Sequence, residues 1–215
     1  MEKKSAVTIV ASIMFIIWII IIKTVDVAKI GPQNTAVGLS HINSGIHELS
    51  GVNMVWYDIT EVLGFLAIGV AGIFAVIGLV QLIKRKSLFK VDGEIIALGG
   101  LFVVVIGFYA LFEKVIINYR PVIMEGSNEV EASFPSSHTM LICTVMGGVM
   151  IVIGKYIKDA KVANILRIVC GIMILITVCG RLVSGVHWFT DIVGGVFISV
   201  ALVGAFSIIV ERIKS

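Results

Sequence analysis

The sequence predicts an all-α, polytopic membrane protein: a single domain over residues 1–215 that forms a bundle of six transmembrane helices. Apolar residues make up 58% of the chain and charged residues only 14%, whereas a soluble domain usually has about 25% charged residues. Six apolar stretches reach the length of roughly 20 residues that a helix needs to cross a bilayer. They lie at about 6–22, 58–83, 93–117, 136–154, 163–180 and 188–210.

The first apolar stretch follows Lys3 and Lys4, as the apolar part of a secretory signal would. Its apolar run is long, however, and no small-residue cleavage site of the A-x-A kind follows it. We therefore expect a transmembrane helix that is retained. Each apolar stretch is expected to be helical, because a helix satisfies its own backbone hydrogen bonds in a solvent that offers none.

Residues 23–57 form the longest connection between the apolar stretches. Four apolar residues recur in it at helical spacing: Leu39, Ile42, Ile46 and Leu49. This pattern predicts a short amphipathic helix that lies in the membrane interface. Trp56 and Tyr57 come just before the second apolar stretch, where aromatic residues commonly mark the boundary between membrane and water.

The basic residues predict how the helices are oriented. Five of the 17 lysines and arginines lie on one side of the membrane: Lys23, Lys29, Lys114, Arg120 and Arg181. The other 12 lie at the termini and between the second and third and the fourth and fifth apolar stretches. The positive-inside rule makes this second side cytoplasmic. We expect an integral protein of a bacterial cell membrane with both termini in the cytoplasm.

Composition argues against two kinds of site. The net charge is only +3 and no basic tract occurs, so we expect no nucleic-acid partner. The three cysteines, Cys143, Cys170 and Cys179, lie in apolar stretches and form no C-x-x-C pair. Neither a disulfide framework nor a zinc site is indicated, and we expect no metal.

Polar residues gather at the predicted outer face of the membrane. A charged side chain costs about 2.5–3.5 kcal/mol near the centre of a bilayer, so its presence calls for an explanation. Six alternating crossings bring three groups to the same side. They are Glu113, Lys114 and Arg120 at the end of the third stretch, Ser136, Ser137 and His138 at the start of the fourth, and Arg181, His187 and Asp191 around the turn from the fifth to the sixth. We expect these residues to form one outward-facing site.

The chemistry of this set suits phosphoryl transfer without a metal. Arg120, Arg181 and Lys114 offer donors for phosphate oxygens, and Ser136 and Ser137 open a helix whose first N–H groups favour an anion.

The imidazoles have complementary roles in this chemistry. His187 and Asp191 are four residues apart, on one helix face, so the carboxylate can orient the ring for nucleophilic attack. His138 remains to protonate the leaving oxygen.

The order and spacing of these residues resemble the three motifs of the type 2 phosphatidic acid phosphatase family. The matching segments are Lys114-x5-Arg120-Pro121, Pro135-Ser136-Ser137-His138 and Arg181-x5-His187-x3-Asp191. The resemblance implies a lipid phosphatase that needs no cofactor. It implies that His187 forms a phosphohistidine and is oriented by Asp191, that His138 is the general acid, and that Lys114, Arg120, Ser136 and Arg181 hold the phosphate.

Three positions depart from the family pattern. Ser137 stands where the family usually has Gly, though its backbone N–H can still serve the phosphate, and Gly180 stands where it usually has Ser. The family's lysine usually lies seven residues before the arginine, at the position of Glu113, whereas Lys114 lies six before Arg120. One residue is a rotation of about 100° on an ideal helix. Lys114 therefore reaches the phosphate only if the helix end is bulged or unwound.

The resemblance leaves the substrate open. Undecaprenyl pyrophosphate and phosphatidylglycerol phosphate are favoured, and phosphatidic and lysophosphatidic acid remain possible; the expected partners are this lipid phosphate and the membrane lipids. Glu125, Glu129 and Glu131, in the acidic loop 125–131, are expected to be solvated or to disfavour highly anionic substrates. The main alternative is a transporter or channel whose charged residues bind an anion, which predicts polar residues in the middle of the spans.

Overall fold

The computed structural model describes residues 2–124 and 126–214, and most of them are helical. The helices are α1 (Glu2–Thr24), α2 (Ser40–Ser50), α3 (Met54–Arg85), α4 (Gly93–Lys114), α5 (Ser137–Tyr156), α6 (Ala160–Val183) and α7 (Phe189–Lys214), with short 3-10 turns η1 (Pro32–Asn34) and η2 (Leu88–Lys90). All except α2 are long and apolar enough to cross a membrane. The predicted all-α bundle of six transmembrane helices is confirmed.

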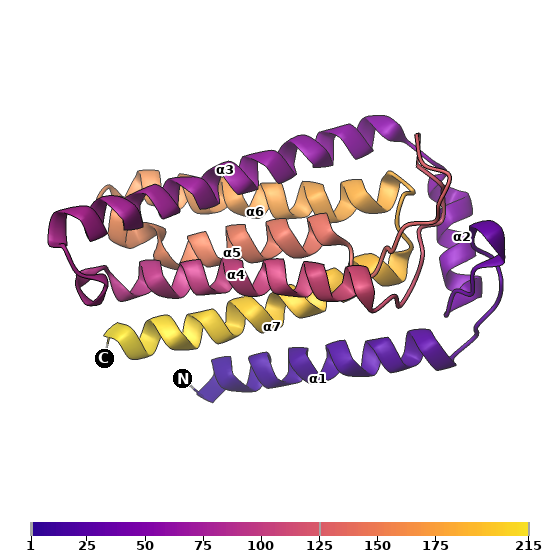
Figure 1. Cartoon of the computed structure of the whole chain (residues 1–215), viewed down its shortest axis with the longest axis horizontal. Helices are drawn as coiled ribbons and strands as arrows, with labels where there is room; N and C mark the ends of the chain where they lie inside the picture. The colour runs from indigo at the N-terminus through magenta and orange to yellow at the C-terminus, as the bar shows by residue number, and fades with distance from the viewer. Residues whose placement is uncertain (1, 125, 215) are drawn as a thin grey trace.

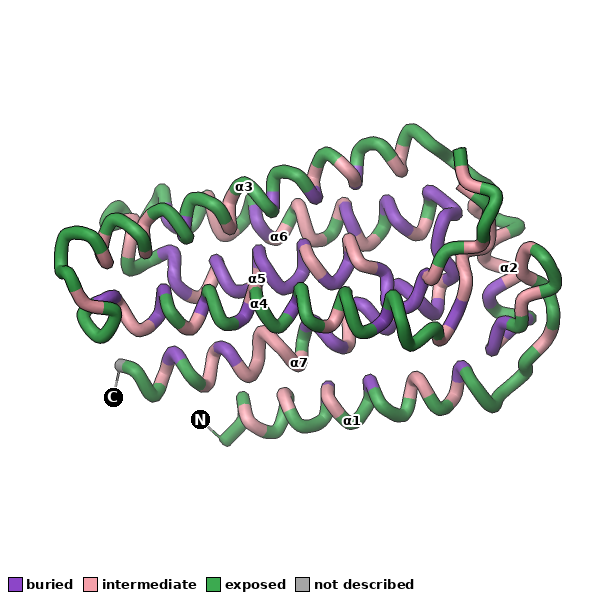
Figure 2. Tube along the Cα trace, viewed as in Figure 1, coloured by how far each residue is buried: buried purple, intermediate pink, exposed green. Residues whose placement is uncertain are grey.

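The six long helices run side by side, and α5 lies at their centre (Figure 1). It contacts α3, α4, α6 and α7, and its inward residues, such as Ile142, Met146 and Val149, are almost completely buried. Buried residues are accordingly concentrated on α5 and on the adjoining end of α7 (Figure 2). The outer helices expose aliphatic side chains, which suits a surface that faces lipid.

Small residues let the helices approach closely. A Cβ atom added at Gly204 of α7 would lie 2.3 Å from Oγ1 of Thr8 in α1, and one at Gly195 would lie 2.9 Å from Cβ of Thr139 in α5. Close backbone packing of this kind replaces the hydrophobic driving force that is missing between helices in lipid. It fixes α7 between α1 and α5.

The two ends of the bundle contain different parts of the chain. Both ends of the chain lie at one end, whereas α2 and the connection 115–136 lie at the other (Figure 1). At the first end Arg85 NH1 lies 2.8 Å from Asp92 Oδ1, and Lys155 Nζ lies 2.6 Å from Glu94 Oε2. The hydrogen bond from Arg85 is the main cause that lowers the pKa of Asp92 to about 2. These ion pairs tie α3, α4 and α5 together.

Two polar residues of the short helix α2 face the protein. Ser40 and Asn43 are buried, whereas Ile42 and Leu49 are 48% and 90% exposed. Two residues of the predicted apolar face are therefore directed away from the bundle, whereas Leu39 and Ile46 are partly buried. Contact of this helix with the membrane interface stays a prediction. Asn43 holds the start of α7, because its Nδ2 donates to Thr190 Oγ1 over 3.0 Å.

Candidate active site

The predicted site residues, Lys114 apart, come from three helices and two connections at the α2 end of the bundle. Ser136 is the N-cap of α5, and Ser137 and His138 begin that helix. Arg181 lies in the last turn of α6, and Asp191 in the first turn of α7. His187 lies in the short turn between α6 and α7, and Arg120 in the connection after α4.

His187 is almost completely buried, at 3% exposure. Its Nδ1 lies 3.7 Å from Asp191 Oδ2, and its Nε2 lies 3.3 Å from Arg181 NH2. A guanidinium can only donate, so Nε2 accepts in that contact, and the proton of the neutral ring is on Nδ1. Burial, followed by the positive charge of Arg181, holds the pKa of His187 well below its usual value. The ring is therefore neutral near pH 7, as a nucleophile must be.

Asp191 is fully buried and held from two sides. Asn118 donates from Nδ2 to Oδ1 over 2.9 Å, and the backbone N–H of Trp188 donates to Oδ2 over 3.0 Å. Donors of this kind stabilise the charged form of a carboxylate. The backbone carbonyl of Asp191 also accepts from the N–H of Ser136 over 3.0 Å, which joins the starts of α5 and α7.

The connection 115–136 is folded back on itself, and this positions two site residues. The backbone N–H of Arg120 donates to Glu131 over 3.0 Å, and that of Ser133 donates to Asn118 over 3.0 Å. The indole N–H of Trp188 donates to the carbonyl of Tyr119 over 2.8 Å. The loop therefore presents Arg120 and Asn118 on one side, toward the start of α7.

Glu61 of α3 contacts both His138 and Arg181, and it is not among the residues that the motifs predict. Its Oε1 lies 3.2 Å from His138 Nε2 and 3.2 Å from Arg181 NH1. Because Arg181 also contacts His187, an unbroken series of contacts runs from His138 through Glu61 and Arg181 to His187. Glu61 could have been identified from the sequence, because a carboxylate inside the second apolar stretch is costly and calls for an explanation.

Arg181 is fully buried and has several partners besides this carboxylate. Its NH1 donates to Thr60 Oγ1 over 3.1 Å, and its Cζ lies 4.9 Å from the centre of the Tyr57 ring. A buried guanidinium is costly unless it is paired and hydrogen-bonded. Arg181 is thus fixed with its donors between the two imidazoles.

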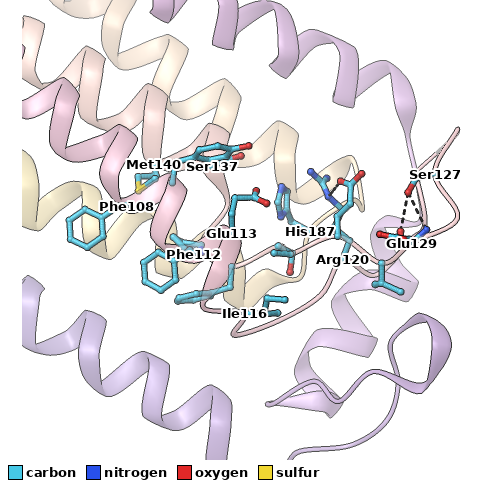
Figure 3. A pocket seen from close by; sticks show the side chains of 17 residues that line it. Phe108, Phe112, Glu113, Ile116, Arg120, Ser127, Glu129, Ser137, Met140 and His187 are labelled. Atoms are coloured by element: carbon cyan, nitrogen blue, oxygen red, sulfur yellow. Dashed lines mark hydrogen bonds and ion pairs between the residues drawn. The ribbon is translucent and has the colours of Figure 1, made fainter.

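A cavity of about 580 Å³ opens beside His187 (Figure 3). Its polar wall includes Arg120 and Ser137, and its apolar wall includes Phe108, Phe112 and Met140 (Figure 3). Three carboxylates also line it: Glu113, Glu129 and Glu131. This arrangement can hold an anionic group beside His187 and an apolar group further along.

The acidic loop is not simply solvated. Glu129 and Glu131 both line the cavity, and Glu131 Oε2 lies 3.0 Å from Arg120 Nε. Residue 125 of this loop lies outside the described residues.

The structure does not bring Lys114 into this cavity. Lys114 is the exposed last residue of α4, and Glu113 lines the cavity instead. The bulge or unwinding that would rotate Lys114 inward is not found, because the N–H of Val115 still donates to the carbonyl of Leu111 over 2.8 Å. Lys114 therefore stays about 100° of helix rotation away from the position that Glu113 occupies.

Ser136 and Ser137 differ in position. Ser136 is fully buried, and its Oγ accepts from Thr139 Oγ1 over 3.0 Å, whereas Ser137 lines the cavity. A cis peptide bond joins Phe134 to Pro135 just before them. Among the described residues, no three His, Cys, Asp or Glu side chains are grouped as the ligands of a metal ion would be.

Comparisons with known proteins agree with the geometry. The family model of the PAP2 superfamily matches residues 93–215, which include all three motifs. The fold is similar to the crystal structure of the first transmembrane PAP2 type phosphatidylglycerolphosphate phosphatase from Bacillus subtilis, with a TM-score of 0.69 and 17% identity over 95% of this chain and 96% of that one. The search of curated proteins gave no match. The family resemblance seen in the motifs is confirmed.

Proposed function

Because the chain belongs to the PAP2 superfamily, we propose that it is a metal-independent phosphatase that removes a terminal phosphate from a lipid phosphate or lipid pyrophosphate. One observation supports this most strongly: the series of contacts from His138 through Glu61 and Arg181 to His187. This series brings two imidazoles and a guanidinium together at one end of the bundle. A nucleophile, a proton donor and a charge stabiliser are what this transfer requires.

In the first step, Nε2 of His187 attacks phosphorus and the bond from phosphorus to the leaving oxygen breaks. His138 donates a proton to that oxygen, and the dephosphorylated lipid leaves. The carboxylate of Asp191, 3.7 Å from Nδ1 of His187, stabilises the charge that the ring gains as it becomes phosphorylated. The guanidiniums of Arg181 and Arg120 stabilise the equatorial oxygens in the transition state.

In the second step, water attacks the phosphohistidine. His138, now neutral, accepts a proton from this water, so the acid of the first step is the base of the second. The bond between phosphorus and Nε2 breaks, inorganic phosphate is released, and His187 returns to its neutral form. The cycle is balanced in protons and needs no metal ion.

The cavity supports a lipid as the leaving group. Phe108, Phe112 and Met140 form an apolar wall beside the polar part of the cavity, and an acyl or isoprenoid chain fits such a surface. Because the similar crystal structure is of a phosphatidylglycerolphosphate phosphatase, phosphatidylglycerol phosphate is the first substrate to test and undecaprenyl pyrophosphate the second. The basic residues near the chain ends favour a site on the outer face of a bacterial membrane.

A phosphate-release assay on purified protein in detergent tests this function. The panel consists of phosphatidylglycerol phosphate, undecaprenyl pyrophosphate, phosphatidic acid and lysophosphatidic acid, each with and without a metal chelator. We expect release from at least one lipid, unchanged by the chelator, and none from the His187→Ala variant. No release from any lipid by folded protein would refute the proposal, and strong inhibition by the chelator would refute its metal-independent form.

A further inference from the structure

Glu61 occupies the position between the proposed proton donor and the buried guanidinium. A single atom, Oε1, lies 3.2 Å from both His138 Nε2 and Arg181 NH1. A substrate whose phosphate is bound by Arg181 and whose leaving oxygen is protonated by His138 needs the same two donors, at similar distances. Two anionic oxygens cannot share this position, because they repel each other and their contact radii overlap.

We infer that Glu61 is an internal competitor of the phosphate: its carboxylate fills an oxygen position of the phosphate site in the free enzyme, and the phosphate group of the substrate displaces it. This inference rests on the proposed function and adds a specific step to it. Substrate binding then exchanges one ion pair of Arg181 for another and leaves the guanidinium paired throughout.

The surroundings of Glu61 permit such an exchange. The Glu61 side chain is 27% exposed, whereas that of Arg181 is fully buried. When Glu61 leaves, Thr60 Oγ1 still accepts from Arg181 at 3.1 Å, and the Tyr57 ring still covers its Cζ at 4.9 Å. The carboxylate is therefore the group that moves when the substrate binds, and the guanidinium stays in place.

The need for Glu61 in the free enzyme follows from the burial of Arg181. A buried charge without a partner is strongly destabilising, so an empty site requires a resident anion. A similar arrangement occurs at Arg120, where Glu131 Oε2 lies 3.0 Å from Arg120 Nε and the Glu131 side chain is 46% exposed. Each guanidinium is thus paired with a carboxylate that is more exposed than itself.

The test compares Glu61→Gln with Asp58→Asn, a matched control. Asp58 lies on the same helix end and is exposed, so its substitution removes one negative charge without touching the site. Binding of inorganic phosphate to detergent-solubilised protein is measured by calorimetry, together with Tm and with the KM and kcat for the best lipid. We expect Glu61→Gln to bind phosphate about tenfold more tightly and to have a lower KM and a lower Tm. Asp58→Asn should match the unmodified protein.

A second variant keeps the test decisive if Glu61→Gln does not fold. Glu61→Asp retains the charge but shortens the side chain by one methylene, so it cannot reach both partners and should also bind phosphate more tightly. Phosphate binding that is unchanged or weaker in the folded variants overturns the inference. Because this binding needs no turnover, tighter phosphate binding in a protein that hydrolyses no lipid supports the inference and counts only against the proposed function.

Discussion

Asn118 donates a hydrogen bond from its Nδ2 to Asp191 Oδ1 over 2.9 Å. Asn118 lies outside the three motifs, in the connection after α4, yet its side chain is buried and contacts the carboxylate that faces the proposed nucleophile. This bond and the one from the N–H of Trp188 fix both oxygens of Asp191. Asn118 is therefore expected to act as a positioning residue for the Asp191–His187 pair.

The first prediction concerns Asn118→Ala. We expect kcat to fall about tenfold with little change in KM, since partners that orient a functional side chain typically contribute 10- to 100-fold. The measurement is steady-state phosphate release, with Asn128→Ala as control because Asn128 is exposed in the same loop. A kcat equal to that of the unmodified protein would show that Asp191 needs no support from Asn118.

The second prediction concerns Asp191→Asn, which keeps the shape of the side chain but removes its charge. The ring of His187 then loses the neighbouring negative charge, 3.7 Å from Nδ1, that stabilises its charged state. By comparison with other Asp–His pairs, kcat should fall by about 10²- to 10⁴-fold. Circular dichroism and Tm check that the variant is folded; a loss below about threefold in folded protein would argue against the pairing.

The third prediction concerns pH. Burial and Arg181 lower the pKa of His187, so the ring stays neutral, and nucleophilic, below the usual histidine pKa of about 6.5. Loss of kcat/KM through protonation of His187 should therefore appear only at lower pH than this. The pH profile of kcat/KM is recorded with a monophosphate lipid and with a pyrophosphate lipid. A limb that differs between the two lipids comes from titration of the substrate, and a limb that they share comes from the enzyme. A shared acid limb centred above about 6.5 contradicts a lowered pKa.

The fourth prediction separates Lys114 from Arg120. Lys114 is exposed and does not line the cavity, so Lys114→Ala should change kcat/KM less than about twofold. Arg120 lines the cavity, and Arg120→Ala should reduce kcat/KM by about 10²- to 10³-fold, as the loss of a charge stabiliser does. Equal losses in both variants would mean that Lys114 enters the site when the substrate is bound.

The sequence predicts the six spans because their length and composition are set by the bilayer itself. The grouping of His138, Arg181, His187 and Asp191 at one end was also predictable, since six alternating crossings leave only two sides. These expectations depend only on the order of the membrane crossings, which can be predicted without knowing which helices touch.

What the sequence could not predict depends on packing and register. Glu61 joins the site because α3 packs against both α5 and α6, and no local pattern specifies those neighbours. Whether Glu113 or Lys114 faces the cavity depends on a shift of one residue along the helix. That shift is decided by whether the end of α4 stays helical. Helical spacing predicted the apolar face of α2, but its polar residue Asn43 faces the protein because it bonds to Thr190.

Detection of the phosphoenzyme tests the central claim most directly. The protein is mixed with lipid substrate that carries a labelled terminal phosphate, quenched within one turnover under alkaline conditions that preserve phosphohistidine, and mapped by mass spectrometry. We expect the label on the imidazole of His187, and no label and no turnover in His187→Asn. Label on another side chain, or turnover by His187→Asn at the rate of the unmodified protein, would contradict the assignment of His187 as the nucleophile.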